Sequence, residues 1–354
     1  MVNYINISNK VAPQKQFYTI LTNPYLTNTG EEGDNRLKVV HNNKHVKAGI
    51  HKDTQKMGDP NTYYSDNFKE NPINFKAINE DVFLLFDDAG LNYAHFFFDM
   101  FGKCMYFDFL KKENPNLKVG IAQEYWTDTG KYNYIKQWLN LYYNNIDVVI
   151  FETNKSYQIK NLILPNCFYW FPETYGHDVI VEKIKETVNN IEKIPTKSKG
   201  CYISRQDTIK KEWYHKRNLV NENELIDRIK NELGYDIIEL MDYDLIEKIQ
   251  IFKSYKNIIQ QNSASNVNLL FSGPEINHII LSNPRMGDWM NFKLEQFSKQ
   301  VNTNLLTIDN VGEYIIEESN PNETNQDNHP WKLTNINGLM DILQQINNDS
   351  IWES

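Results

Sequence analysis

Cysteine is scarce in this chain, with only Cys104, Cys167 and Cys201 among 354 residues. The three are widely separated, so they fit neither the framework of a small disulfide-rich domain nor the close pairs that hold structural zinc. We therefore expect a protein of a reducing compartment.

Long apolar runs are also missing. The longest, around Phe83–Phe86 and Phe96–Phe98, are far too short to cross a bilayer. The first residues show neither the charged region nor the apolar stretch of a signal peptide. We expect no membrane span and a cytoplasmic location, in a bacterial cell or in the host of a virus.

No basic tract stands out, and the formal net charge is -9. A nucleic-acid partner is not expected, because such proteins neutralise phosphates with clustered Lys and Arg. One local basic segment, residues 210–217, follows a predicted strand. Hydrophobic residues make up 40% and charged residues 23%, as in globular proteins with room for two domains. The aromatic content of 13% suits core packing and sugar stacking equally.

Short apolar runs alternate with helical patterns from about residue 80 onwards. In the first half, predicted strands span 82–86, 117–122 and 147–151, and predicted helices span 91–112, 131–143 and 177–191. In the second half, predicted strands span 201–204, 236–240, 256–260 and 276–281, and predicted helices span 222–233, 244–254, 263–271 and 335–346. This alternation predicts an α/β fold with parallel sheets covered by helices. Residues 194–200 form a predicted linker between two α/β halves that face a cleft.

Two strand ends in the second half carry polar residues suited to an anion. The strand Cys201–Ser204 is followed by Arg205, and a later strand leads into Asn262, Ser263, Ala264 and Ser265 at the start of a predicted helix. A guanidinium binds phosphate through two hydrogen bonds, and the N–H groups at a helix start bind the same anion. The pattern predicts a site for a nucleotide diphosphate.

The same segments resemble glycosyltransferase family 61. The matching motifs are Tyr202-Ile203-Ser204-Arg205, the run from Arg217 to Asn221-Glu222, residues 247–252, residues 262–271, and upstream Asn92-Tyr93-Ala94-His95 with Asp99. Lys103 stands where that family usually has Arg. The resemblance covers roughly residues 81–290. It implies an inverting, metal-independent transferase of GT-B type that uses a nucleotide sugar, commonly linked to UDP.

The chain departs from the family pattern in its loop. Asn262 replaces the family's histidine, and Ser263 and Ser265 replace two glycines. Serine still leaves backbone N–H groups open at a helix start, and Ser263 can cap the helix, but glycine allows a closer approach. After the next strand, Ser282 stands where the family often has glutamate. These changes put the contacts to the donor in question.

Inverting transfer needs a base for the acceptor hydroxyl, which the resemblance places in the first half. His95 and Asp99 are four residues apart on a predicted helix, so an aspartate could orient the imidazole towards an acceptor. The structural alternative is that His95 packs against Phe98 and Asp99 pairs with Lys103. Asp87 and Asp88, at the end of the strand 82–86, are reserve candidates for the base.

The donor-side residues also have structural alternatives. Arg205 contacts the diphosphate or forms a surface ion pair with Asp207. Ser263 to Ser265, together with Asn268, cradle phosphate or belong to an ordinary capped helix. Glu222 is a further candidate, or simply an acid that favours the first turn of a helix. Arg217 is a further donor-side candidate.

A metal-dependent GT-A enzyme is a competing interpretation. Asp242-Tyr243-Asp244 has the D-x-D pattern that holds Mn²⁺ or Mg²⁺ on a diphosphate. However, Asp244 is also well placed to cap the helix that follows. His41 and His45 are four residues apart in a polar, loop-like region, so zinc is not expected there.

The preferred interpretation is a metal-independent glycosyltransferase with two Rossmann-like domains. The predicted domains are residues 1–194 on the acceptor side, residues 195–310 for the nucleotide sugar, and a final loop and helix over 311–354. Its partners would be a donor, expected to be UDP-linked, and a glycan acceptor in surface polysaccharide or glycoprotein synthesis. A degenerate module that binds nucleotides or glycans without catalysis is the alternative.

Overall fold

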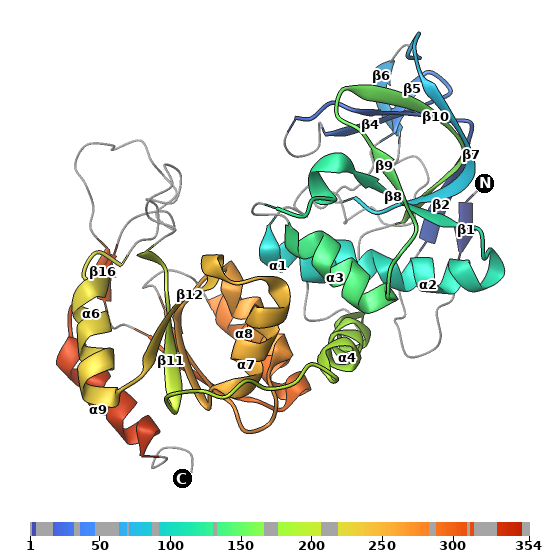
Figure 1. Ribbon diagram of the computed structural model, residues 1–354. Helices are drawn as coiled ribbons and strands as arrows, with labels where there is room; N and C mark the ends of the chain where they lie inside the picture. Colours follow the sequence, from blue (N-terminus) through green and yellow to red (C-terminus); the bar gives the residue numbers. More distant parts are fainter. Residues whose placement is uncertain are drawn as a thin grey trace. The chain divides into compact units, whose positions relative to one another are not determined.

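The computed structural model describes residues 2–4, 17–31, 36–46, 64–68, 71–86, 92–129, 133–165, 176–206, 219–282, 288–309, 312–314 and 331–348. The chain divides into two compact units, Met1–Lys183 and Ile184–Ser354 (Figure 1). Both units combine strands and helices, so the predicted α/β class is confirmed. The GT-B arrangement and the domain boundaries at residues 194 and 310 stay predictions.

The first unit is built on a ten-stranded mixed sheet. Its strands are β1 (Val2–Tyr4), β2 (Phe17–Thr22), β3 (Tyr25–Asn28), β4 (Leu37–His41), β5 (Lys44–Val46), β6 (Tyr64–Phe68), β7 (Lys76–Leu84), β8 (Lys118–Ala122), β9 (Val148–Phe151) and β10 (Lys155–Pro165). The order β10-β7-β8-β9 is parallel. The sequence predicts β7, β8 and β9 as strands of a parallel sheet, but not β10. The remaining pairs are antiparallel, and they include β4 with β5, which carry His41 and His45. The prediction that these histidines lie in a loop is therefore wrong.

The helix predicted over residues 91–112 is one helical path with an irregular start. Asn92 caps α1 (Tyr93–His95), which leads into a π turn, η4 (Phe96–Met100), a 3₁₀ turn, η5 (Phe101–Lys103), and then α2 (Cys104–Glu113). After β8 come η6 (Gln123–Tyr125) and α3 (Asn133–Tyr143). Edge-to-face aromatic pairs join the two helical segments, with ring centroids 4.9 Å apart for Phe97–Trp138 and for Tyr93–Tyr134. This aromatic packing accounts for part of the high aromatic content.

The second unit is a five-stranded parallel sheet in the order β12-β11-β13-β14-β15. Its strands are β11 (Gly200–Ser204), β12 (Asp236–Glu239), β13 (Asn257–Gln261), β14 (Asn277–Leu281) and β15 (Asn304–Ile308). The accompanying elements are α6 (Glu222–Arg228), η7 (Ile229–Leu233), η8 (Leu240–Asp242), α7 (Leu245–Ser254), η9 (Ala264–Phe271), α8 (Asp288–Val301), β16 (Gly312–Tyr314), β17 (Trp331–Leu333) and α9 (Ile336–Asn347). The boundary between the two units falls within α4 (Gly176–Val188). Helices cover both faces of this sheet (Figure 1).

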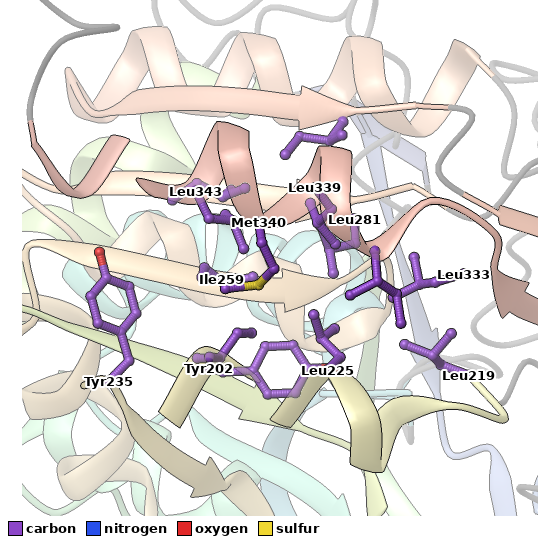
Figure 2. Packing of buried hydrophobic residues seen from close by; sticks show 14 of the residues in the cluster. Tyr202, Leu219, Leu225, Tyr235, Ile259, Leu281, Leu333, Leu339, Met340 and Leu343 are labelled. Atoms are coloured by element: carbon purple, nitrogen blue, oxygen red, sulfur yellow. The ribbon is translucent and has the colours of Figure 1, made fainter. Parts of the chain in front are cut away.

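One face of the sheet packs against α6 and α9. Tyr202, Ile259 and Leu281 on the strands meet Leu225 of α6 and Met340 of α9 in a buried apolar cluster (Figure 2). The alternation of β13 places Ile259 and Gln261 on this face and leaves Ile258 and Gln260 for the other. On that opposite face, the ring of His278 stacks on Phe252 of α7 at 6.0 Å. The sheet is therefore doubly wound, with apolar residues on both faces as expected for parallel strands.

A row of amides crosses the amino-terminal end of the sheet. Asn304 Nδ2 donates to Asn277 Oδ1, and Asn277 Nδ2 donates to Asn257 Oδ1, both at 2.7 Å. Asn257 Nδ2 then donates to the Tyr235 hydroxyl at 2.7 Å, which donates to Asn347 of α9 at 3.0 Å. The asparagines lie at matching positions of β13, β14 and β15. This asparagine ladder ties three strands and the last helix together.

Candidate functional site

The strand order of the second unit creates a topological switch point between β11 and β13. The chain runs from β11 to β12 on one side and then to β13 on the other side of β11. In such sheets, ligands bind at the carboxyl ends of the two strands flanking the switch point. Arg205 follows β11 and Asn262 follows β13. The structure therefore brings the two predicted donor-binding segments to adjacent strand ends.

A buried polar cluster lies behind these two strand ends. Glu222 begins α6, and its Oε1 accepts hydrogen bonds from the Tyr202 hydroxyl at 2.9 Å, from the Arg205 backbone N–H at 3.1 Å and from Gln261 Nε2 at 2.8 Å. Gln261 Nε2 also donates to the Tyr202 hydroxyl at 3.0 Å. Glu222 is only 2% exposed. This carboxyl therefore fixes the end of β11, the end of β13 and the start of α6 relative to one another.

The cluster has more acceptors than donors. Glu222 Oε2 and Gln261 Oε1 are buried, and neither finds a hydrogen-bond donor within the described ranges. Burial raises the pKa of Glu222, and the negative charge of Glu239 acts in the same direction. The hydrogen bonds from Arg205 and Tyr202 and the charge of Arg205 oppose this shift, but burial is the larger effect.

The loop after β13 is organised by its own side chains. Asn266 Oδ1 accepts the Ser263 backbone N–H, and Asn266 Nδ2 donates to the Gln261 carbonyl at 3.2 Å. The hydroxyls of Ser263 and Ser265 lie 2.7 Å apart. Ser263 is the N-cap of η9, as predicted, although η9 is a 3₁₀ helix rather than an α-helix. Short polar side chains that bond locally to the backbone compete with α-helical geometry.

The backbone N–H groups of this loop are partly in use. The N–H of Asn262 donates to the Leu281 carbonyl at 3.1 Å, and that of Ser263 donates to Asn266. A phosphate at this loop would therefore meet the N–H groups of Ala264 and Ser265 first. Asn268, the remaining predicted donor residue in the loop, is buried inside η9.

Two buried amides stand at the end of β13. The side chains of Gln260 and Asn262 are 1% and 3% exposed, and both ends of each amide lack a hydrogen-bond partner in the part of the chain that the structure describes. Buried amides without partners are costly, so groups of this kind concentrate where a ligand or ordered water completes the hydrogen bonding. Asn262 was predicted from the sequence, whereas Gln260 was not.

The Asn221-Glu222 motif divides into two structural roles. Asn221 Nδ2 donates to the Leu333 carbonyl at 3.1 Å, and its Oδ1 accepts the Leu333 N–H at 2.9 Å, so this side chain holds β17. Glu222 belongs to the polar cluster rather than acting only as a first-turn acid. The predicted donor residue Arg217, and Asp207 as an ion-pair partner, lie outside the described residues.

In the first unit, the predicted base lies at the start of the helical path. Asn92 Oδ1 accepts the backbone N–H groups of Ala94 at 3.0 Å and of His95 at 3.5 Å, so Asn92 is a helix cap. His95 is half-buried at the junction with the π turn η4, which contains Asp99. Hydrogen bonds in a π turn run from residue i to i+5, so the alignment expected for an α-helix does not transfer directly. The Asp99 side chain, and Asp87 and Asp88, lie outside the description.

Lys103 is fully buried and donates through Nζ to the carbonyl of Phe86, which follows the carboxyl end of β7. A buried cation at a strand end needs acceptors around it. Lys103 thus holds the helical path against the end of β7.

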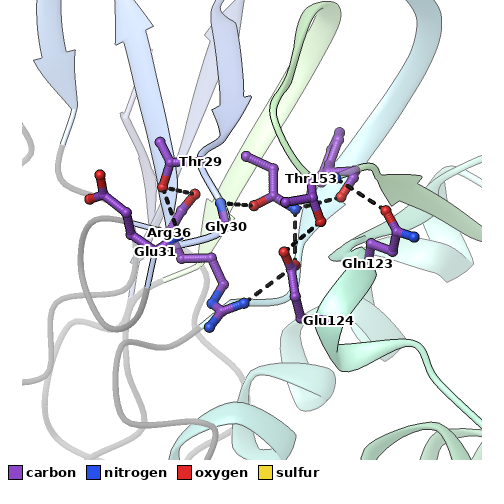
Figure 3. A network of polar contacts seen from close by, with 9 residues as sticks. Thr29, Gly30, Glu31, Arg36, Gln123, Glu124 and Thr153 are labelled. Carbon is purple, nitrogen blue, oxygen red and sulfur yellow. Dashed lines mark hydrogen bonds and ion pairs between the residues drawn. The ribbon is translucent and has the colours of Figure 1, made fainter.

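A second polar network lies at the carboxyl ends of β8 and β9 (Figure 3). Glu124 accepts hydrogen bonds from Asn28 Nδ2 at 3.0 Å and from the Thr153 hydroxyl at 2.7 Å, and Arg36 pairs with it at 3.4 Å. Burial alone would raise the pKa of Glu124, but these hydrogen bonds and the charge of Arg36 together lower it. The ionised form of Glu124 is therefore favoured, and its hydrogen bonds connect the ends of β3, β8 and β9. Sequence analysis missed it, because its partners come from segments far apart in the chain.

The D-x-D segment has the geometry of a helix start. Asp244 is the N-cap of α7: its Oδ1 accepts the Glu247 N–H at 2.9 Å, and its own N–H donates to Glu247 Oε2 at 2.8 Å. This reciprocal pair is a capping box, so the predicted capping role of Asp244 is confirmed. Across the described ranges, no three His, Cys, Asp or Glu side chains gather as potential metal ligands.

Sequence analysis identified Arg205, Glu222 and the loop but not Tyr202 or Gln261 as members of the site. The available signal was the pair Gln260-Gln261 at the end of a buried strand, because amides in an apolar strand must find polar partners. In the sequence, Tyr202 is indistinguishable from an ordinary core residue. Its role follows from the hydrogen bonds of its hydroxyl group.

Comparison with known proteins identifies the family of this chain. None of the helices in the described ranges combines the length and apolar character that a bilayer span requires. No curated protein matches the chain. The family described as Glycosyltransferase 61 matches residues 93–279, which is more than half of the 354 residues and includes His95, Arg205, Glu222 and the loop at 262–268. The chain therefore belongs to glycosyltransferase family 61 and is a transferase of sugars.

Proposed function

We propose that the protein is an inverting, metal-independent glycosyltransferase that takes a sugar from a nucleotide diphosphate donor, UDP-linked in our preferred form, and passes it to a glycan acceptor. The observation that carries the proposal is the placement of Arg205 and the Ser263–Ser265 loop at the two strand ends of the switch point. The carboxyl ends of strands at a switch point bind nucleotides in doubly wound folds.

In this proposal, the diphosphate is bound by the Arg205 guanidinium and by the N–H groups of Ala264 and Ser265. His95 removes the proton from the acceptor hydroxyl, and the resulting oxygen attacks the anomeric carbon from the face opposite the diphosphate. The bond from that carbon to the diphosphate oxygen breaks, and the nucleoside diphosphate leaves with the bonding electrons. Positive charge and N–H dipoles at the leaving group stabilise its developing charge in place of a metal.

Ligand-observed NMR against a panel of sugar nucleotides in EDTA tests whether the protein binds a nucleotide-sugar donor without metal. Saturation transfer to one nucleotide and one sugar ring, without metal, is the expected result. Binding only after addition of Mn²⁺ would favour the Asp242/Asp244 alternative and overturn metal independence. An anomeric configuration in the product that matches the donor would overturn the inverting mechanism. Binding without turnover for any acceptor would support the degenerate module.

We further propose a cytoplasmic enzyme of surface polysaccharide or glycoprotein synthesis. The support is the sequence alone: cysteines are few, and the longest apolar runs are shorter than a bilayer span requires. Fractionation of the native cells, with the protein detected in the soluble cytoplasmic fraction, is the expected outcome.

A further inference from the structure

Two buried oxygens in the polar cluster at the switch point lack a hydrogen-bond donor among the described residues. Glu222 Oε2 and Gln261 Oε1 are both acceptors, both are buried, and neither has a donor among the described residues. The two planar groups are already joined along one arm, because Gln261 Nε2 donates to Glu222 Oε1 at 2.8 Å. The second hydrogen of that amide goes to the Tyr202 hydroxyl. Each of the two side chains therefore keeps one oxygen, Glu222 Oε2 or Gln261 Oε1, without a donor among the described residues.

A single proton would satisfy both oxygens. Placed on Glu222 Oε2, it makes this oxygen a donor, and Gln261 Oε1, on the amide that already donates to Glu222, offers an acceptor. Without that proton, two buried acceptors stay unpaired and a negative charge stays buried, which are both costly. We infer that Glu222 is protonated in the resting enzyme, that it forms a two-armed acid–amide pair with Gln261, and that this neutral form is the one that binds the donor diphosphate at Arg205.

The groups around Glu222 are consistent with a neutral acid. From β11, Tyr202 and the Arg205 backbone donate to Oε1, and the Arg205 charge favours the carboxylate. From β12, the charge of Glu239 disfavours it, and from β13 the uncharged Gln261 donates to Oε1. Burial is the largest influence and raises the pKa of Glu222.

The second half of the inference rests on the proposed function, in which Arg205 binds a diphosphate. Glu222 accepts the backbone N–H of that arginine, so a carboxylate here would lie directly behind the anion site. Like charges at such a distance repel, and the carboxylate would also compete for the guanidinium. Glu222 is therefore a positioning residue whose protonation sets the strength of diphosphate binding.

Infrared spectroscopy of the protein without ligand tests the protonation. Exposed carboxyls are ionised at pH 8, so a band from a protonated carboxylic acid at that pH would come from a buried group. We expect such a band in the wild type and its loss in Glu222→Gln. Asp108 also has its pKa raised by burial, so Asp108→Asn is the matched control and should leave the Glu222 band in place. A wild-type spectrum that Glu222→Gln does not change would overturn the inference.

Calorimetric binding of UDP between pH 6 and pH 9 tests the coupling. Glu222→Gln keeps the hydrogen bonds to Oε1 and supplies a neutral donor to Gln261 Oε1. UDP binding to the wild type should weaken by about tenfold more over this range than binding to Glu222→Gln. Comparing the two proteins cancels the ionisation of UDP itself. Equal pH dependence, when the infrared band of the wild type disappears within the same pH range, would overturn the coupling.

Failure of the proposed function would look different. If neither protein binds UDP or any other nucleotide at any pH, the donor site is wrong, and the infrared band alone decides whether Glu222 is protonated. The infrared measurement on the wild type needs no variant to fold, because the band should disappear as the pH rises through the pKa of Glu222.

Discussion

The side-chain amide of Asn277 donates a hydrogen bond to Oδ1 of Asn257 at 2.7 Å, across two neighbouring parallel strands. Both residues are fully buried, and Asn277 also accepts from Asn304 at 2.7 Å. Hydrogen bonds connected in a chain strengthen one another in a medium of low polarity. Asn277 is therefore the residue of the asparagine ladder that has an asparagine on both sides.

Replacing Asn277 by Ala should lower the free energy of unfolding by roughly 2–3 kcal/mol, because Asn257 Oδ1 and Asn304 Nδ2 both lose their partners. Asn304→Ala, at the partly exposed end of the ladder, is the matched control and should cost roughly 1 kcal/mol. Urea unfolding measures both. Equal losses of unfolding free energy in the two variants would contradict the larger contribution of Asn277.

His278 should make the protein sensitive to acid. Burial lowers the pKa of His278 to about 3. Its Nε2 lies 2.8 Å from Ser272 Oγ, which already donates to the Phe252 carbonyl, so Nε2 carries the proton and donates. A histidine whose pKa is lowered on folding contributes stability above its unfolded pKa, and this is lost as the pH falls from about 6.5 towards 3.

At pH 4, protonation of His278 in the unfolded chain should cost the wild type roughly 3 kcal/mol relative to pH 7. Glutamine keeps an N–H donor for Ser272 but takes up no proton. Thermal unfolding of His278→Gln should therefore vary less between pH 7 and pH 4 than that of the wild type. Parallel curves for the two proteins would contradict the assignment.

Lys253 should hold the carboxyl end of α4. Its Nζ donates to the carbonyls of Val188 at 2.8 Å, Asn189 at 3.2 Å and Ile191 at 2.5 Å. Carbonyls at the end of a helix lack the N–H partners of a further turn, so a cation there is favourable, although the Val188 carbonyl also accepts the Ile191 N–H at 3.0 Å. Lys253→Met should speed hydrogen exchange at residues 185–191 and destabilise the protein by roughly 1–2 kcal/mol. Lys230→Met, at an exposed lysine, should do neither.

Arg205 should matter for donor binding rather than for stability. If its guanidinium binds the diphosphate, Arg205→Ala should raise the Kd for the nucleotide about 10- to 100-fold, because charged hydrogen bonds are lost. Arg228 is a suitable control, since it pairs with Glu232 and donates to Asn337 at 2.6 Å on the protein surface. A Kd that does not change in Arg205→Ala while it changes in Arg228→Ala would reject the proposed anion site.

His95 should affect the chemical step. As the base, its replacement by Ala should lower kcat by roughly 100- to 10,000-fold and leave the donor KM almost unchanged. His45→Ala, on strand β5, controls for loss of a histidine elsewhere in the first unit. Full activity of His95→Ala would remove His95 from the mechanism and direct attention to Asp99, Asp87 and Asp88.

The sequence predicts much of the second unit because its signals are local. Buried strands are runs of apolar residues, and helix starts carry their own caps, as Asp244 does before α7. Arg205 and the serine loop were found because each directly follows such a strand. The order of the strands, which brings the two together, is long-range information.

The predictions fail where partners are distant in sequence. Strands β2, β3, β5 and β6 are short, with little apolar periodicity of their own, and they become strands by pairing with neighbouring strands such as β4 and β10. The π turn at Phe96–Met100 is indistinguishable from α-helix in the pattern of apolar residues. Likewise, the role of Gln261 depends on Tyr202 and Glu222, which are 59 and 39 residues away in the chain.

The asparagine ladder also bears on how the sheet folds. Parallel strands are joined by long crossovers, so no tight turn fixes their alignment, and a slip by one residue would turn each strand over. Each hydrogen bond of the ladder forms only when the two strands that it joins place their asparagines at matching positions. Misaligned pairings would bury amides without partners and would be rejected energetically. The ladder therefore disfavours misaligned strand pairings during folding. It lies at the end of the sheet opposite to the proposed diphosphate site.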